Sequence, residues 1–181
     1  MGKLFEELDE DLQAWIAAQA VFFVATAPRD DEGLVNLSPR GLACLTVLGP
    51  RRVAWVDSTG SGVETIAHLR ENGRIVLMWC SFTDPPRIVR LHGRGRVVLP
   101  GEPEYDDVTA RVPAQPSARA VIVVEATRIS DSCGFGVPRL DFVGERDQMY
   151  RWAQSKGPDG VAAYRADRNI SSLDGLAGLS G

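Results

Sequence analysis

The stretch that most constrains the fold runs from Val53 to Trp79 and reads VAWVDSTGSGVETIAHLRENGRIVLMW. It begins with an apolar, β-prone segment, Val53 to Asp57, and ends with another, Arg74 to Trp79. Between them, glycine and small hydroxyl residues break the strand pattern, and apolar residues then recur at helical spacing as far as Asn72-Gly73. The sequence therefore predicts a strand, a loop, a short helix and a second strand.

The loop before this helix allows two interpretations. Hydroxyl-rich loops at helix N-termini can bind anions, because free backbone N–H groups and the positive end of the helix dipole point outward there. Ser61 and Glu64, however, have the spacing of a capping box, which would explain both residues without a ligand. Asp57 and Glu64 would also place negative charge near a phosphate. An anion site and a capped helix both fit the sequence.

Length, charge and cysteine content limit the function classes. A chain of 181 residues with a net charge of −4 suits a single domain and argues against a general nucleic-acid binder. It has no apolar run that would span a membrane, and its acidic N-terminus lacks a signal-peptide core, so we expect a cytoplasmic protein. Because Cys44, Cys80 and Cys133 are widely spaced and the chain has only two histidines, no metal site is expected.

The remaining segments predict a mainly β fold with flanking helices. Short strands separated by Gly-Pro and charged turns favour an antiparallel barrel or sandwich. We expect strands at 21–27, 35–37, 42–48, 87–99 and 118–130, and helices at 4–20, 104–112 and 145–156. We treat 1–181 as one domain, with an N-terminal helix (1–20), a core (21–131) and a Gly-rich loop, helix and tail (132–181). The tail carries NISSLDGL and is expected to lie across a partner subunit or to be loose.

Three further positions attract attention. The segment Ser38-Pro39-Arg40 contains a proline that cannot join a ladder, so it is expected at a sheet edge or bulge, where Arg40 could contact a ligand or be solvated. The strand 87–99 would expose a basic face, suited to a phosphorylated ligand or to acidic neighbours, while Gly93 and Gly95 permit a bulge or a close backbone approach. Phe135, between two glycines, could stack on a ring or fill the core. The basic face comprises Arg90, His92, Arg94 and Arg96.

Taken together, VNLSPRG, the segment 53–79 and RIVRLHGRGRVV resemble the pyridoxamine 5′-phosphate oxidase-like family of flavin-binding split β-barrels, over roughly Val21 to Val98. The segments SCGFGVP, GERDQMYRWAQSKG and NISSLDGL are similar to its longer members. The resemblance implies a six-stranded antiparallel split β-barrel that pairs as a homodimer, with FMN at the interface. It implies cofactor contacts from Ser38, Pro39, Arg40, Asp57, Ser58, Thr59, Ser61, Gly62, Thr65 and Arg90. Ser61 and Thr65 would hold the phosphate, and Ser38 and Asp57 would bond the ribityl chain or ring edge.

The chain departs from true pyridoxamine phosphate oxidases in ways that leave its activity open. It has Glu64-Thr65 where they have an Arg-Lys pair, Leu45 where they have lysine, and Ile88 where they have glutamine. Three functions follow. The first is an FMN-dependent oxidoreductase acting on a small molecule, in which the flavin ring and not a protein dyad does the redox chemistry. The second is a reductase using a deazaflavin coenzyme, whose acidic tail would favour the Arg90–Arg96 face. The third is a non-catalytic cofactor-binding or stress-related dimer.

Overall fold

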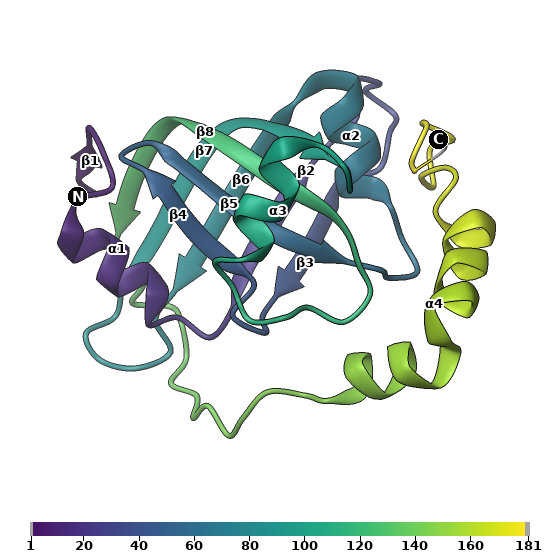
Figure 1. Ribbon diagram of the computed structural model, residues 1–181. Helices are drawn as coiled ribbons and strands as arrows, with labels where there is room; N and C mark the ends of the chain where they lie inside the picture. Colours follow the sequence, from purple (N-terminus) through teal and green to yellow (C-terminus); the bar gives the residue numbers. More distant parts are fainter. Residues whose placement is uncertain (1, 180–181) are drawn as a thin grey trace.

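The computed structural model describes residues 2–179, which form one curved antiparallel sheet with helices around it (Figure 1). The strand order is β3-β2-β6-β7-β8-β5-β4, and β1 pairs with β8. The strands are β1 (Leu4–Phe5), β2 (Phe22–Thr26), β3 (Asn36–Arg40), β4 (Leu45–Gly49), β5 (Arg52–Ser58), β6 (Arg74–Cys80), β7 (Ile88–Val98) and β8 (Ala118–Ser132). The helices are α1 (Glu10–Ala17), α2 (Glu64–Asn72), α3 (Pro103–Thr109) and α4 (Gln148–Arg168).

The predicted mainly β class with flanking helices is confirmed, although the sheet has eight strands where six were expected. One of the eight is the two-residue β1, which pairs only with the end of β8. β3 is an edge strand of the sheet, as its proline predicted. Pro39 is paired with a neighbouring strand, β2, on one side only, so its missing N–H leaves no gap in a second ladder.

The core fills the inside of the curved sheet. Trp55 and Trp79 are almost fully buried, and Phe22 contacts both rings, with centroids 5.9 and 5.8 Å away. Aromatic pairs at such distances add to the stabilisation from burying their area. Leu12 and Ile16 close one end of this core from α1, which begins later than predicted because Asp9 is its N-cap and accepts from the Leu12 N–H at 2.8 Å.

α2 is held against the sheet by close backbone approach. A Cβ on Gly95 of β7 would lie 2.8 Å from a Leu69 methyl group, so glycine lets the helix approach the strand. Gly73 ends α2 with φ of 69°, and its N–H donates to the Leu69 carbonyl at 3.0 Å, as the Asn-Gly pair predicted. These contacts fix the C-terminal half of α2 against β7.

The two faces of β7 differ as predicted. Val89 and Leu91 are buried in the core, whereas Arg94 and Arg96 are exposed on the opposite side. Arg96 forms an ion pair with the Glu104 carboxylate of α3, and Arg94 donates to a backbone carbonyl at 2.8 Å. The basic face therefore already has partners within its own chain.

The chain after β8 passes below the sheet and then runs along one side of it as α4 and the tail (Figure 1). α4 extends beyond its predicted end: Gly157, with φ of 66°, breaks it, and the helix restarts at Pro158, a residue well suited to a first turn. Trp152 and Tyr164 pack edge to face across the break, with centroids 5.1 Å apart. The tail after α4 is not loose but lies on its own chain, and Phe135, with 82% of its surface exposed, does not fill the core.

Candidate functional site

The N-terminus of α2 lacks a side-chain cap. Its N-cap residue is Val63, which makes no side-chain hydrogen bond to the helix. The capping-box interpretation is therefore wrong. A capping box needs its glutamate at the third helical position, from which the side chain bonds the N-cap N–H, and Glu64 is at the first. Its carboxylate instead lies over Gly62, where a Cβ would be 2.2 Å from Glu64 Oε2. The first N–H groups of α2 thus receive no side-chain cap.

A cavity of about 250 Å³ opens at this helix start. It lies between the inner face of β3, the loop before α2 and the beginning of β8. We call it the β3–α2 cavity. It is lined by Asn36, Ser38, Arg40, Gly60, Ser61, Gly62, Glu64, Thr65 and Arg119.

A buried carboxylate holds the two arginines of this cavity. Asp57 on β5, 1% exposed, accepts from Arg119 Nε at 2.8 Å and pairs with Arg40 Nη2 at 3.1 Å. Arg119 Nη1 donates to Asn169 Oδ1 at 2.8 Å. Within residues 2–179, Arg40 Nε is buried without a hydrogen-bond partner, and Arg119 Nη2 also has none. The two guanidinium groups are fixed in place and still have donors to offer.

The register of the sheet explains why Arg119 enters the cavity. Asp57 pairs with Ala120 and Ser58 with Ala118, so Arg119 is the additional residue of a bulge between β5 and β8. Bulges redirect side chains and are common beside functional sites. The Arg119 side chain is buried at 3% exposure, directly before the apolar run Ala120 to Val124 of β8.

A polar network fixes the other wall of the cavity. The Asn36 side-chain amide donates to Thr26 Oγ1 at 3.0 Å and to Thr65 Oγ1 at 3.1 Å, linking β3 to the first turn of α2. Thr26 in turn contacts Nδ1 of His68, which is fully buried, at 3.0 Å. Because each polar group supports the next, the hydroxyl of Thr65 is held in a defined position.

The structure brings together most of the residues that the sequence singled out. Ser38, Arg40, Ser61, Gly62 and Thr65 line the β3–α2 cavity, and Asp57 lies directly behind the two arginines. Ser58 and Thr59 come directly before Gly60–Gly62 in the chain but do not line the cavity. The Ser58 hydroxyl is buried and without a partner among residues 2–179, and Thr59 Oγ1 donates to the Ser117 carbonyl at 2.8 Å and accepts from Arg165 Nε at 2.7 Å.

Pro39 and Arg90 lie elsewhere. They share one row of the sheet's outer face, Pro39–Phe23–Met78–Arg90, and three strand spacings separate them, about 14 Å. Arg90 donates to Ser132 Oγ at 3.0 Å. Their predicted cofactor contacts therefore cannot be made within the β3–α2 cavity of the same chain.

Three residues of the site were not singled out from the sequence. Asn36, Arg119 and Asn169 are brought in by strand pairing and by the packing of the tail. Arg119 could have been found as the one charge within the apolar run Ala118 to Val124, and Asn169 as the first residue of NISSLDGL.

Charges near the cavity act on two further groups. Burial raises the pKa of the Cys44 thiol to about 12, although the nearby Arg40 opposes the shift. Burial lowers the pKa of Arg165, and the neighbouring Arg119 acts in the same direction. A thiol with so high a pKa is not a nucleophile at neutral pH, so Cys44 is a packing residue here.

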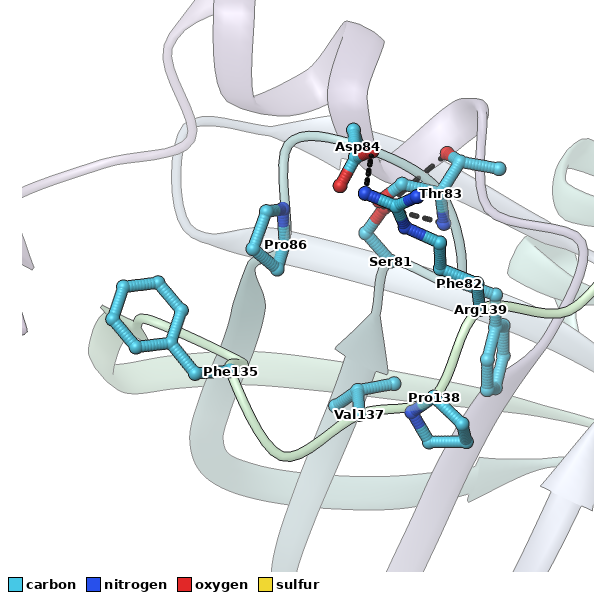
Figure 2. Close-up of a pocket in the computed structure, with 9 residues that line it drawn as sticks. All are labelled: Ser81, Phe82, Thr83, Asp84, Pro86, Phe135, Val137, Pro138 and Arg139. Atoms are coloured by element: carbon cyan, nitrogen blue, oxygen red, sulfur yellow. Dashed lines mark hydrogen bonds and ion pairs between the residues drawn. The ribbon is translucent and has the colours of Figure 1, made fainter.

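Among the other cavities of the described residues, one of about 540 Å³ shares Arg119 with the β3–α2 cavity, and two more lie around the turn 81–86. The larger of these two, about 730 Å³, lies between the end of β3, the segment 18–21 and the segment 140–149, and Arg40 lines it as well. The smaller, about 310 Å³, lies between the turn 81–86 and the segment 135–139 (Figure 2). Its cation, Arg139, is paired with Asp84, so this cavity is less suited to binding an anion than the β3–α2 cavity is.

Residues 2–179 contain no group of three or more His, Cys, Asp or Glu side chains arranged to hold a metal ion. Over the same range, none of the helices combines the length and apolar character needed to cross a membrane.

The chain is similar to proteins of one known family. The family model described as pyridoxamine 5′-phosphate oxidase matches residues 8–133. The protein ustO of Aspergillus flavus, named as a pyridoxamine 5′-phosphate oxidase family protein, is 41% identical over 196 residues, covering 99% of this chain and 78% of ustO.

Solved structures show the same fold at low identity. A putative pyridoxamine 5′-phosphate oxidase from Lactobacillus delbrueckii matches with a TM-score of 0.54 and 18% identity, covering 70% of this chain and 98% of its own. The FAD binding protein from Mycobacterium smegmatis matches with a TM-score of 0.52 and 13% identity, covering 72% and 98%.

Proposed function

Because this chain belongs to the pyridoxamine 5′-phosphate oxidase family, we propose that it is a flavin-dependent oxidoreductase that binds FMN through its β3–α2 cavity. The observation that carries the proposal is the pair Arg40 and Arg119, held by Asp57 beside an uncapped helix N-terminus. The name of the Mycobacterium smegmatis structure, an FAD binding protein of the same fold, supports a flavin ligand.

The chemistry of the cavity fits a phosphate group. Arg40 Nε is a buried donor without a partner among residues 2–179, and Ser38, Ser61 and Thr65 add hydroxyl groups. Hydrogen bonds from guanidinium groups to phosphate are among the strongest in proteins, and free helix N–H groups favour the same charge. Glu64 opposes binding, and with it the charges of Arg40, Arg119, Asp57 and Glu64 sum to zero, so the attraction for a phosphate rests on the directed donors of the two arginines and of the α2 N-terminus.

When bound, FMN would supply the hydride or electron transfer, and the protein would contribute binding and orientation. Ser61, Thr65, Arg40 and Arg119 would hold the phosphate. The 730 Å³ cavity shares Arg40 with this site, and its lining is mainly apolar with a few charged groups, as in cavities that bind small molecules. We place the unidentified small-molecule substrate there.

We further propose that two copies of the chain pair through the outer face of β3, β2 and β6. This face carries Leu37, Phe23, Val76 and Met78, with Leu37 exposed and the other three partly exposed. Contiguous apolar surface of this kind is uncommon on a monomer and typical of an interface. If the cofactor lay at this interface, as the family resemblance implies, Pro39 and Arg90 could make the contacts predicted for them.

Glu64 favours one alternative, a non-catalytic dimer with a degenerate cofactor site. Its side chain lines the cavity and brings a negative charge to the place where an anion would bind. A deazaflavin coenzyme, the other alternative, would rely on the Arg90–Arg96 face, where Arg96 is already paired with Glu104.

Titration with FMN tests the proposal. We expect the purified protein to take up FMN and show its visible absorption, and Arg40→Ala to weaken binding at least tenfold, because about 1.4 kcal/mol corresponds to tenfold and a charge-assisted bond contributes about that much. Arg151→Ala, which removes an exposed arginine of α4, is the matched control and should bind as wild type. Equal affinity of Arg40→Ala and wild type would contradict the proposal. Uptake of a deazaflavin but not of FMN would support the deazaflavin alternative. Uptake of neither coenzyme would support the non-catalytic dimer.

A further inference from the structure

The tail after α4, residues 169–179, folds into a compact turn of its own. Asn169 O accepts from the Leu179 N–H at 2.7 Å, the Ser172 N–H donates to Leu176 O at 2.9 Å, and Ser171 and Ala177 form a β-bridge. The family model ends at residue 133, so this turn lies outside the matched part of the chain. Its sequence is the NISSLDGL motif, which the proposed function leaves unexplained.

This tail turn contacts the β3–α2 cavity through one buried side chain. Asn169 is fully buried, its Oδ1 accepts from Arg119 Nη1 at 2.8 Å, and its Nδ2 donates to the Gly60 carbonyl at 3.0 Å. A single amide thus fixes both a cation that lines the cavity and the loop that precedes α2. The side chain touches the cavity's walls and does not itself line the cavity.

Further contacts attach the tail turn to α2 and to the segment before β3. The Leu173 N–H donates to Glu64 Oε1 at 3.3 Å, and Asp174 Oδ1 accepts from the Leu34 N–H at 3.1 Å. Gly178 accepts from Arg70 and lies against Val63, where a Cβ would be 2.7 Å from a Val63 methyl group. The turn therefore packs on the N-cap residue of α2 itself.

We propose that Asn169 is a positioning residue of the β3–α2 cavity, and that docking of the tail turn and binding of a phosphate-bearing ligand stabilise each other. The second part rests on the proposed function. With the turn docked, Arg119 and the 60–62 loop hold the geometry that a phosphate needs. A ligand that binds this state more tightly than the undocked state must favour docking by the same free energy.

Hydrogen exchange and FMN titration together test the proposal. Asn169→Ala should speed amide exchange in peptides covering 60–63 and 170–179 without any ligand, and should weaken FMN binding about tenfold. In the wild type, FMN should slow exchange in 170–179. Leu173→Ala is the control, because that side chain is 77% exposed in the same turn and its N–H contact is made by the backbone. It should leave both measurements unchanged.

Asn169→Asp separates the two contacts of the amide. The carboxylate can still accept from Arg119 but cannot donate to Gly60, so amide exchange at 60–63 should rise. This variant keeps the test available where Asn169→Ala does not fold. Unchanged exchange at 60–63 in a folded Asn169 variant would overturn the positioning role. If wild type binds no FMN, the proposed function and the linkage fall, while exchange without ligand still decides the positioning role. FMN binding without protection of 170–179 would overturn the linkage alone.

Discussion

At the scale of single residues, Asp57 determines what the β3–α2 cavity can do. The family resemblance implied that its carboxylate would bond a cofactor directly, but both of its oxygens face arginines, Arg40 on one side and Arg119 on the other. A buried carboxylate with two cationic partners is stable because its charge is compensated, and it also prevents the two guanidinium groups from turning away. Asp57 is therefore best understood as the residue that orients the cavity's donors.

Glu64 is the residue whose replacement should improve ligand binding. Removing its negative charge from the cavity by Glu64→Gln should tighten FMN binding roughly fivefold, because a like charge at a partly exposed site costs about 1 kcal/mol. Glu7→Gln, which neutralises an exposed carboxylate of the N-terminal segment, should have no effect. Fluorescence titration measures both constants, and weaker binding by Glu64→Gln would show that the carboxylate supports the site.

Whether a residue of the site could be predicted from the sequence depends on how far it lies in the chain from the other site residues. Ser61, Gly62 and Thr65 could be predicted because they lie next to each other in the sequence, directly before α2 or in its first turn. Arg119 and Asn169 could not, because a bulge in the β5–β8 register and the docking of the tail bring them in, and neither is encoded locally. Long-range register is set by the whole core, which a linear pattern of residue types does not display.

At the scale of elements, β7 shows how glycines shape the sheet. The pairing of β7 with β8 shifts between His92 and Gly93, as the predicted bulge or close approach requires. Gly93→Ala should lower the free energy of unfolding by about 1–3 kcal/mol, because its Cβ would lie 2.4 Å from the Glu125 carbonyl oxygen and force the strands apart. Chemical denaturation measures the change.

Gly49→Ala provides the matched control for that substitution. No atom lies within 4 Å of the added Cβ in β4, so the free energy of unfolding should change by less than about 0.5 kcal/mol. If the two variants were equally stable, the packing ascribed to Gly93 would be wrong.

The helices show which element boundaries the sequence encodes. The end of α2 was predictable because Gly73 must adopt a left-handed conformation there. Its start was not, because the capping box placed the N-cap at Ser61 and the chain places it at Val63. The break of α4 at Gly157 was also predictable, but the helix after it was not, because its sequence is polar and tertiary contacts such as Trp152–Tyr164 decide whether it forms.

At the scale of the whole molecule, the outer face of β3, β2 and β6 predicts the assembly. Sedimentation should give the wild type twice the chain mass of 19.7 kDa. Leu37→Glu combined with Val76→Glu should give monomers, because these residues share one row of that face and charges there would be buried without partners. Leu173→Glu, at an exposed position of the tail turn, should leave the mass unchanged. A monomeric wild type would contradict the interface.

The affinity ratio between FMN and riboflavin tests the account most directly, because the two ligands differ only in the phosphate. If Arg40, Arg119 and the start of α2 bind that phosphate, wild type should bind FMN at least a hundredfold more tightly than riboflavin, since two or more charge-assisted bonds depend on it. In Arg40→Ala the ratio should fall at least tenfold. Equal affinities for the two ligands in the wild type, or a ratio that Arg40→Ala leaves unchanged, would contradict the assignment of the cavity.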